Sequence, residues 1–328
     1  MKTKIVYVLT SNEKDLLLEQ LLLSLYSLKY HNPTADVYLV VDQDTFSSIK
    51  GCRTLIEEYL TDIIKVDAPT EYNNMLRSRW LKTSLREYIE GDFLFVDSDT
   101  IVTDSLEECD QWTCDLAAVV DRHIPMNEHH QYYKYICNRA ADCGWVFEQT
   151  DAAYFNSGVM FVKDSKISHD FYKKWHEYWV LGTKNSVFQD QPTLGKTNKE
   201  FGYIIHELDG IWNCQIMANG IKFLSKSKII HYFNAERQSE KKSIFYIPSD
   251  KAIYLKIKHD GFRIDDKIKN YIIEGRSAFA SNYAVFADEQ LVAIKDPFSQ
   301  YVLKGFYGRN YYYKFLRFLF NVYSFLKR

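Results

Sequence analysis

The sequence has almost no net charge, no closely spaced cysteine pair and no long uncharged apolar run. A formal net charge of −2 creates no global field that would attract nucleic acid, so we expect no nucleic-acid partner. None of the six cysteines belongs to a CxxC pair, which argues against zinc-ribbon and thioredoxin folds. No uncharged stretch is long enough to span a bilayer.

The first residues, MKTKIVYVLTSNEKD, turn polar too early for a signal peptide. Reduced thiols in a cytoplasmic protein are the simplest explanation for the scattered cysteines. The apolar share of 46% and the charged share of 26% are typical of a globular protein. A chain of 328 residues can form one large domain or two smaller ones.

Apolar runs and helical periodicities alternate through the first third of the chain. The predicted strands are Ile5–Leu9, Val37–Val41, Ile63–Val66 and Phe93–Val96, and the predicted helices are Asp15–His31, Thr45–Leu60 and Ser78–Ile89. This alternation predicts an α/β fold, with a mostly parallel sheet and helices on both faces. Ligands bind beyond the carboxyl ends of strands in such sheets, so the polar residues that follow the strands are the candidate site.

The fourth predicted strand ends in two acidic residues one position apart. Asp97 and Asp99 directly follow the wholly apolar run Phe93–Val96. If strand geometry persists, residues at i and i+2 face the same side, where two carboxylates can hold one hard cation. The alternative is a polar turn that ends the strand, with an aspartate capping the next element.

Four segments, in this order, resemble glycosyltransferase family 8. They are RSRWLKTSLREYIEGDFLFVDSDT at residues 77–100, FNSGVMFV at 155–162, DQPTL at 190–194 and IIHYFN at 229–234. The family has the GT-A fold, which is a Rossmann-like, mostly parallel sheet flanked by helices, and it includes bacterial lipopolysaccharide galactosyl- and glucosyltransferases. The resemblance covers roughly the first three-quarters of the chain.

The resemblance implies a metal site. Asp97 and Asp99 look like the family's metal-binding Asp-x-Asp motif, and His231 looks like its third protein ligand. The expected cofactor is Mn²⁺, or Mg²⁺ in its place, which would neutralise a diphosphate and stabilise it as a leaving group. Taken alone, His231 would more often be an ordinary core or surface histidine.

The resemblance also implies which residues bind the donor. Arg79 is expected to contact the donor sugar or phosphate, and Lys82, three residues later, to support the same site. A solvated helix face is the alternative interpretation of Lys82. The other expected donor contacts are Thr10, Ser11, Asn12, Ser98, Asn156 and Ser157. Here the chain departs from the commoner family form, because its loop after the first strand lacks the usual aromatic residue.

Asp190 and Gln191 are similar to the family's pair beneath the anomeric carbon. Asp190 would accept hydrogen bonds from sugar hydroxyls, and the Gln191 carbonyl oxygen would stabilise positive character on the ring. The family retains anomeric configuration, and a neutral amide oxygen is a poor nucleophile. We therefore expect same-face attack, with the departing phosphate acting as base. A helix N-terminus, with Asp190 as cap and Pro192 in the first turn, is compatible with this role.

The end of the resembling region departs from the family pattern. The family often places a glycine and then a diphosphate-binding lysine after its late histidine. Asn234 can replace the glycine because asparagine tolerates left-handed backbone geometry. Arg237 or Lys241 can replace the lysine, and the sequence does not choose between them.

The acceptor site is less well marked. Asp121 and His123 are candidates for this site, with weaker support than the donor and metal residues have. Trp212-Asn213 resembles a family segment near the acceptor. The acceptor itself is expected to be a saccharide or a lipid-linked saccharide.

Beyond residue 240 the chain is expected to be an appended helical region, which gives a catalytic domain at 1–240 and an extension at 241–328. A short pair of strands, Tyr283–Phe286 and Leu291–Ile294, is predicted inside the extension. Residues 310–328 have the periodicity of an amphipathic helix with a wide aromatic face and a basic polar stripe. Such a helix suits a membrane interface, and the alternative is docking on the protein body.

These observations predict a metal-dependent retaining transferase that moves a hexose from UDP-galactose or UDP-glucose to a saccharide or glycolipid acceptor. Its expected setting is cell-surface polysaccharide synthesis, such as lipopolysaccharide synthesis, in the cytoplasm or peripherally on the inner face of the membrane. One alternative is a haloacid-dehalogenase-type phosphatase that uses Asp97 as nucleophile and Asp99 as acid/base. The other alternative is a non-catalytic module that binds sugar nucleotides.

Overall fold

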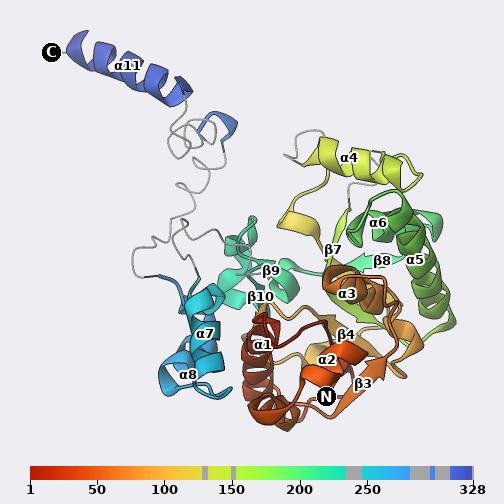
Figure 1. The fold of residues 1–328 in the computed structure, drawn as a ribbon. Helices are drawn as coiled ribbons and strands as arrows, with labels where there is room; N and C mark the ends of the chain where they lie inside the picture. Colours follow the sequence, from red (N-terminus) through yellow and green to blue (C-terminus); the bar gives the residue numbers. More distant parts are fainter. Residues whose placement is uncertain (128–131, 149–152, 234–245, 281–295, 300–310, 327–328) are drawn as a thin grey trace. The chain divides into compact units, whose positions relative to one another are not determined.

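The computed structural model describes residues 1–127, 132–148, 153–233, 246–280, 296–299 and 311–326. Met1–Ala280 form one compact unit, and Ser281–Arg328 form a second (Figure 1). The division of the chain after residue 240 into a catalytic domain and an extension stays a prediction. The residues named as replacements for the late glycine and lysine lie outside the described residues, and so does the predicted pair of short strands: Asn234, Arg237, Lys241, Tyr283–Phe286 and Leu291–Ile294.

A seven-stranded sheet forms the centre of the first unit, with the order β3-β2-β1-β4-β7-β6-β8. Its strands are β1 Lys4–Leu9, β2 Val37–Asp42, β3 Asp62–Val66, β4 Phe93–Val96, β6 Leu116–Val120, β7 Phe155–Val162 and β8 Ile205–Glu207. Among these strands, β7 alone runs antiparallel to its neighbours. The four strands predicted from apolar runs and the mostly parallel sheet are therefore confirmed.

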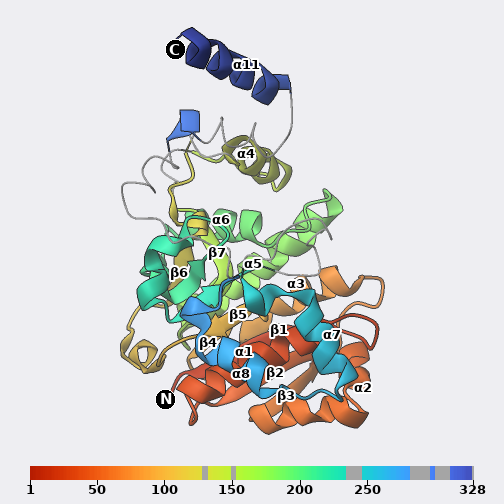
Figure 2. The ribbon, with the colours of Figure 1, turned by 90° about the vertical axis from the view of Figure 1, so that its left-hand side faces the viewer.

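Helices cover both faces of this sheet (Figures 1 and 2). The α-helices of the first unit are α1 Leu17–His31, α2 Gln43–Ser48, α3 Asn74–Thr83, α4 Tyr133–Asp142, α5 Lys166–Lys184, α6 Gln191–Glu200, α7 Lys251–His259 and α8 Asp266–Ile273. The 3-10 helices are η1 Gly51–Tyr59, η2 Leu85–Glu87, η3 Glu107–Gln111, η4 Asp121–His123, η6 Gly210–Asn213, η7 Gly220–Lys226, η9 Ile247–Ser249 and η10 Gly275–Ser277.

Alternation along the strands divides the core into two layers, because successive side chains of a strand point to opposite faces. In β4, Leu94 and Val96 pack into the layer beneath α1, α7 and α8. Phe93 and Phe95 pack into the opposite layer, beneath α3, α5 and α6. A strand that is covered on both faces must be apolar throughout, which explains the unbroken apolar runs of the sequence.

Two predicted helices have different bounds in the structure. The helix expected at Thr45–Leu60 is interrupted, because α2 ends at Ser48 and η1 begins at Gly51, whose φ of +59° breaks α-helical geometry. Helix α3 begins earlier than expected, since the Asn73 side chain accepts a hydrogen bond from the Leu76 amide at 3.0 Å and caps the helix.

A second, three-stranded sheet lies beside the first and has the order β5-β10-β9. It consists of β5 Thr100–Val102, β9 Cys214–Gln215 and β10 Ile229–His231. β5 and β10 are antiparallel, with His231 opposite Thr100. The segment Asp97-Ser98-Asp99 is thus the connection between β4 of the large sheet and β5 of the small one. This connection brings the acidic motif next to a residue from much later in the chain.

The second unit contains α11, Tyr311–Leu326, which confirms the helix predicted near the C-terminus. Its described apolar side chains are largely exposed, with Phe318 at 63% and Phe325 at 79%. Within the described ranges of the chain, none of the helices is both long and apolar enough to cross a membrane.

Candidate active site

Asp97, Asp99 and His231 form a cluster of possible metal ligands at the junction of the two sheets. One ligand atom from each residue can be chosen so that all three atoms lie within 4.8 Å of one another. His231 is 3% exposed, whereas the carboxylates keep 29% and 17% of their side chains accessible. Two carboxylates and one imidazole suit a divalent cation such as Mn²⁺. The predicted grouping of the Asp-x-Asp motif with His231 is present, and its binding of metal stays a prediction.

A chain of hydrogen bonds fixes the orientation of the His231 ring. Asp121 can only accept, and it takes a hydrogen bond from Asn156 Nδ2 at 2.9 Å. Asn156 Oδ1 therefore accepts from Asn213 Nδ2 at 2.9 Å, which leaves Asn213 Oδ1 to face His231 Nδ1 at 3.0 Å. Nδ1 of His231 must then carry the proton, and Nε2 faces Asp99 Oδ1 at 3.2 Å. This arrangement presents Nε2 as the ligating atom.

Gly158 in β7 leaves the space in which the cluster lies. A Cβ atom at this position would be 2.5 Å from His231 Cε1 and 2.8 Å from Asp97 Oδ2. Both distances are far below van der Waals contact. The Gly158 amide also donates to Asn156 Oδ1 at 2.9 Å, and its carbonyl accepts from the Asp97 amide at 2.7 Å. A residue without a side chain at position 158 is therefore required for the close approach of these chain segments.

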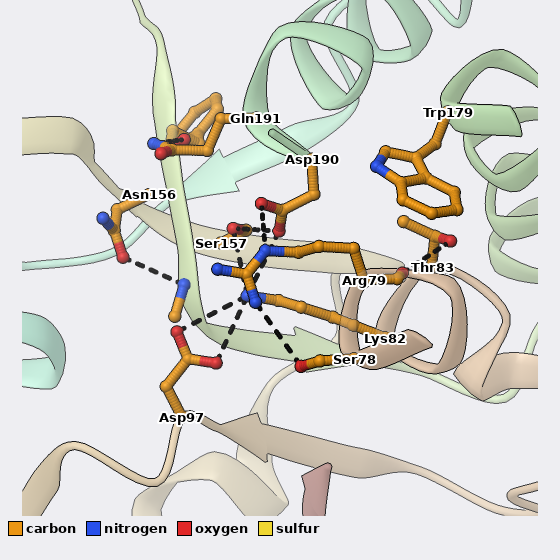
Figure 3. A network of polar contacts seen from close by, with 12 residues as sticks. Ser78, Arg79, Lys82, Thr83, Asp97, Asn156, Ser157, Trp179, Asp190 and Gln191 are labelled. Carbon is orange, nitrogen blue, oxygen red and sulfur yellow. Dashed lines mark hydrogen bonds and ion pairs between the residues drawn. The ribbon is translucent and has the colours of Figure 1, made fainter. Parts of the chain in front are cut away.

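A network of charged side chains, of which Lys82 and Asp190 are buried, adjoins the cluster (Figure 3). Lys82 reaches from α3, with Nζ 3.3 Å from Asp97 Oδ1 and 3.2 Å from Asp190 Oδ2. Ser157 Oγ donates to Asp190 Oδ2 at 2.7 Å, and Arg79 Nε lies 3.3 Å from Asp190 Oδ1. The Lys82 side chain is only 4% exposed, so a solvated helix face is wrong for this residue. The structure brings together five residues that the sequence assigned to the site.

Burial and neighbouring charges set the ionisation of these groups. Burial alone would raise the pKa of Asp190, but Lys82 and Arg79 outweigh it and hold that pKa well below its usual value. Burial would lower the pKa of His231, but the neighbouring Asp99 carboxylate outweighs it and raises that pKa above its ordinary value. His231 and Asp99 therefore stabilise each other's charged forms. A divalent cation that took both residues as ligands would have to displace the proton from Nε2 of His231.

Asp190 occupies the N-cap position of α6, but its side chain does not cap the helix. The carboxylate is directed to Lys82, Arg79 and Ser157 instead, while Pro192 lies in the first turn. Gln191 Nε2 donates to the Phe155 carbonyl oxygen at 3.1 Å. With its amide nitrogen held in this way, the side-chain oxygen is the group left to meet a ligand.

Polar side chains in the loop after β1 already form hydrogen bonds with other groups of the protein. Ser11 Oγ donates to Asp15 Oδ1 at 2.6 Å and lies 3.2 Å from Arg53. Thr10 Oγ1 donates to the Asn74 carbonyl oxygen at 2.7 Å. Ser11 is 1% exposed and Thr10 is 4% exposed, whereas Asn12 is partly exposed. Contact of these residues with a base or ribose stays a prediction, as it does for Ser98, which is partly exposed between the two aspartates.

A cavity of about 360 Å³ is lined by His123, one of the two residues expected to mark the acceptor side, and Asp121 is not among its lining residues. His123 and Phe223 line it, the end of β6 and Leu208 form an aliphatic wall, and Lys222 and Glu207 supply charge. Burial lowers the pKa of His123 to about 4, so its ring is neutral and accepts from the Gln215 amide at 3.1 Å.

The turn that carries His123 is held in an unusual conformation. Arg122 and His123 both have positive φ, at 58° and 56°, which is costly for residues other than glycine. Gln215 and Asn219 hold this turn through the Arg122 amide and carbonyl. The role of Gln215 was not predicted, because no local pattern marks a residue that bonds to a turn so distant in sequence.

Comparison with known proteins gives three findings. The sequence model described as Glycosyl transferase family 8 matches residues 23–237. The galactosyltransferase LgtC, in complex with donor and acceptor sugar analogues, has a TM-score of 0.52 at 16% identity, covering 82% of this chain and 99% of that chain. An active-site mutant of LgtC gives 0.53 at 15% identity, with 81% and 100% covered. No curated protein sequence matches the chain. At these identities the structural likeness shows a shared fold, the GT-A fold.

Proposed function

The chain belongs to glycosyltransferase family 8, and from this premise we propose that it is a metal-dependent enzyme that moves a hexose from a UDP-sugar to a saccharide or glycolipid acceptor with retention of configuration. The observation that carries the proposal is the cluster of Asp97, Asp99 and His231 next to the Lys82–Asp190 pair. Family membership sets aside the phosphatase alternative. UDP-galactose and UDP-glucose are the donors we propose.

The donor set of the cluster fits Mn²⁺, and Mg²⁺ as a weaker substitute, because an imidazole ligand suits Mn²⁺ better than Mg²⁺. Asp97 and Asp99 would hold the ion together with Nε2 of His231, at the place that the missing side chain of Gly158 leaves open. When bound, the cation would neutralise diphosphate charge and so stabilise the leaving group.

Arg79 and Lys82 would supply further positive charge on the side of the diphosphate and sugar. Both already neutralise Asp190, whose low pKa keeps it ionised and able to accept hydrogen bonds from sugar hydroxyls. Asn156 and Ser157, at the start of β7, would contact the same sugar. Such groups are placed before the substrate arrives, so little reorganisation is needed at the moment of reaction.

The retaining step would occur on one face of the sugar. The bond between the anomeric carbon and the phosphate oxygen breaks, and the acceptor oxygen bonds to the same face. The acceptor proton passes to the departing phosphate oxygen. The Gln191 side-chain oxygen, oriented by the hydrogen bond from its amide nitrogen to Phe155, would stabilise positive character on the ring. The acceptor would lie against His123 and Phe223 in the cavity that these residues line.

We predict UDP release that depends on Mn²⁺ and on the sugar of the donor. Purified protein is incubated with a panel of UDP-sugars and a GDP-sugar control, and UDP is quantified with and without a saccharide acceptor. We expect release from UDP-galactose or UDP-glucose, stimulation by the acceptor, and a loss of at least about a hundredfold after chelation with EDTA, which added Mn²⁺ reverses. Binding of UDP without turnover would instead support the non-catalytic module.

We further propose that α11 binds the inner membrane surface, which would place the enzyme in the cytoplasm near lipid-linked acceptors. Residues 297–328 contain no Asp or Glu, and they contain six Lys or Arg: Lys304, Arg309, Lys314, Arg317, Lys327 and Arg328. Exposed Phe315, Phe318 and Phe325 supply apolar surface on the same helix. Aromatic and basic groups on one interfacial helix favour anionic lipid surfaces.

Replacement of Phe318 and Phe325 by aspartate should weaken binding to vesicles that contain phosphatidylglycerol by at least about tenfold. Sedimentation with vesicles measures the effect. Ile167→Asp serves as a matched control, because Ile167 is 46% exposed on α5 of the first unit. Equal vesicle binding by the double variant and the wild type would contradict a membrane role and favour docking on the protein body.

A further inference from the structure

Helix α7 lies beyond the family-matched residues 23–237 and packs beside α1 in both ribbon views (Figures 1 and 2). Tyr254 and Lys258 are one turn apart on this helix, so their side chains project from the same face. Ile257 between them is fully buried in the core layer that also contains α1. The helix is therefore fixed to the protein body, and two polar groups reach inward from it.

Lys258 is bonded to the loop that joins β1 to α1. Its Nζ donates to the Glu13 carbonyl oxygen at 2.5 Å and to the Asp15 carbonyl oxygen at 2.9 Å. The N-cap residue of α1, Leu16, makes no side-chain cap, and the Asp15 carboxylate accepts from the Leu17 amide at 3.1 Å instead, so Lys258 bonds the backbone of the residue whose side chain meets the start of α1. Arg53 holds the same loop from the other direction, through the Asn12 carbonyl oxygen at 3.2 Å.

Tyr254 is bonded to the residue that follows the third member of the metal cluster. The Tyr254 and Tyr232 hydroxyls are 3.1 Å apart, and both side chains are almost fully buried. Tyr232 directly follows His231, and its amide donates to the Asp99 carbonyl oxygen at 3.2 Å. One turn of α7 thus contacts both the loop between β1 and α1 and the residue that follows His231.

We propose that Lys258 is a positioning residue for the nucleotide part of the donor, and that α7 sets the separation between the nucleotide loop and the metal cluster. The inference rests on the proposed function and on the predicted contact of Ser11 and Asn12 with the base or ribose of the donor. Lys258 touches no reacting atom. A loop released from Lys258 must be ordered again when the donor binds, which weakens binding and leaves the bond-breaking step unchanged.

The test compares Lys258→Met, Lys258→Arg and the control Lys256→Met. Lys256 lies on the same helix and pairs with Asp260 and Asp265 at the surface. We expect Lys258→Met to raise the KM for the UDP-sugar and the Kd for UDP by roughly tenfold, with kcat within about twofold of the wild type. Arginine at this position should restore most of the affinity, and the control should match the wild type.

Amide hydrogen exchange gives a readout that does not depend on activity. Lys258→Met should speed exchange at Asn12 and Leu17, whose amides donate to the Asp15 carboxylate, while amides of β2 are unchanged. Unchanged KM and unchanged exchange in Lys258→Met would overturn the positioning role. If the wild type binds no UDP at all, the proposed function fails, and the exchange data still decide whether Lys258 orders the loop.

Discussion

Asp99→Asn is expected to lower the rate of UDP release roughly a thousandfold and to raise the Mn²⁺ concentration needed for half-maximal activity. The substitution keeps the size of the side chain but removes one of two carboxylates that can ligate the cation. Several kcal/mol of charge stabilisation at the leaving group would be lost, and each 1.36 kcal/mol is a factor of about ten in rate. Steady-state UDP release measured across a Mn²⁺ titration separates the loss of affinity from the loss of rate.

The matched control for this variant is Asp104→Asn. Asp104 lies five positions further along the chain and bonds to Arg276 at 2.7 Å, away from the cluster. Asp104→Asn should retain wild-type turnover and Mn²⁺ dependence. Wild-type activity in a folded Asp99→Asn protein would rule out the metal site described above.

Asp190→Asn is expected to lower the free energy of unfolding by about 3 kcal/mol and to lower activity by at least about a hundredfold. The wild-type carboxylate lies between Lys82, Arg79 and Ser157, and its side chain is 7% exposed. A neutral amide leaves the buried Lys82 ammonium without one of its two counter-charges. Denaturant unfolding, followed by circular dichroism, measures the stability change, and UDP release measures the activity.

The stability difference should depend on pH with a defined sign. The folded-state pKa of Asp190 is held below its unfolded value of about 3.9, so its carboxylate contributes fully above that pH. The difference between wild type and variant should therefore shrink as pH falls below about 4. Asp170→Asn is the control, because Asp170 pairs with Lys166 at the surface and should leave stability unchanged. An Asp190→Asn protein as stable as the wild type at neutral pH would show that the network does not hold the site together.

Local patterns predicted the centre of the sheet because its central strands, such as β1 and β4, are covered on both faces. The unbroken run Phe93–Val96 is what such a strand requires, and it also located Asp97 and Asp99 at the strand end. The interruption of the helix expected at Thr45–Leu60 was not predicted, although glycine, here Gly51 with a φ of +59°, is the residue type that commonly takes a left-handed conformation at helix ends. Apolar periodicity carries no information about such a backbone conformation.

Contacts between distant segments were beyond the reach of local patterns. The family resemblance grouped Asp97, Asp99 and His231, but the hydrogen bonds from Asp121 through Asn156 and Asn213 that orient the histidine depend on the folded arrangement. These residues belong to separate elements, and no spacing rule relates them. No spacing rule relates Lys258 to Glu13 either, because Lys258 lies near the C-terminal end of the first unit and Glu13 lies near its N-terminus.

The junction between the two sheets has a mechanical consequence. Asp97 is tied to the large sheet through its amide, which bonds to Gly158, whereas the backbone of Asp99 is tied to Tyr232 of the segment after β10. A small displacement of the three-stranded sheet relative to the seven-stranded sheet would change the distances between the ligand atoms without breaking the hydrogen bonds of either sheet. The affinity for the cation would therefore depend on how the two sheets are aligned. A bound cation would in turn stabilise one alignment of the sheets.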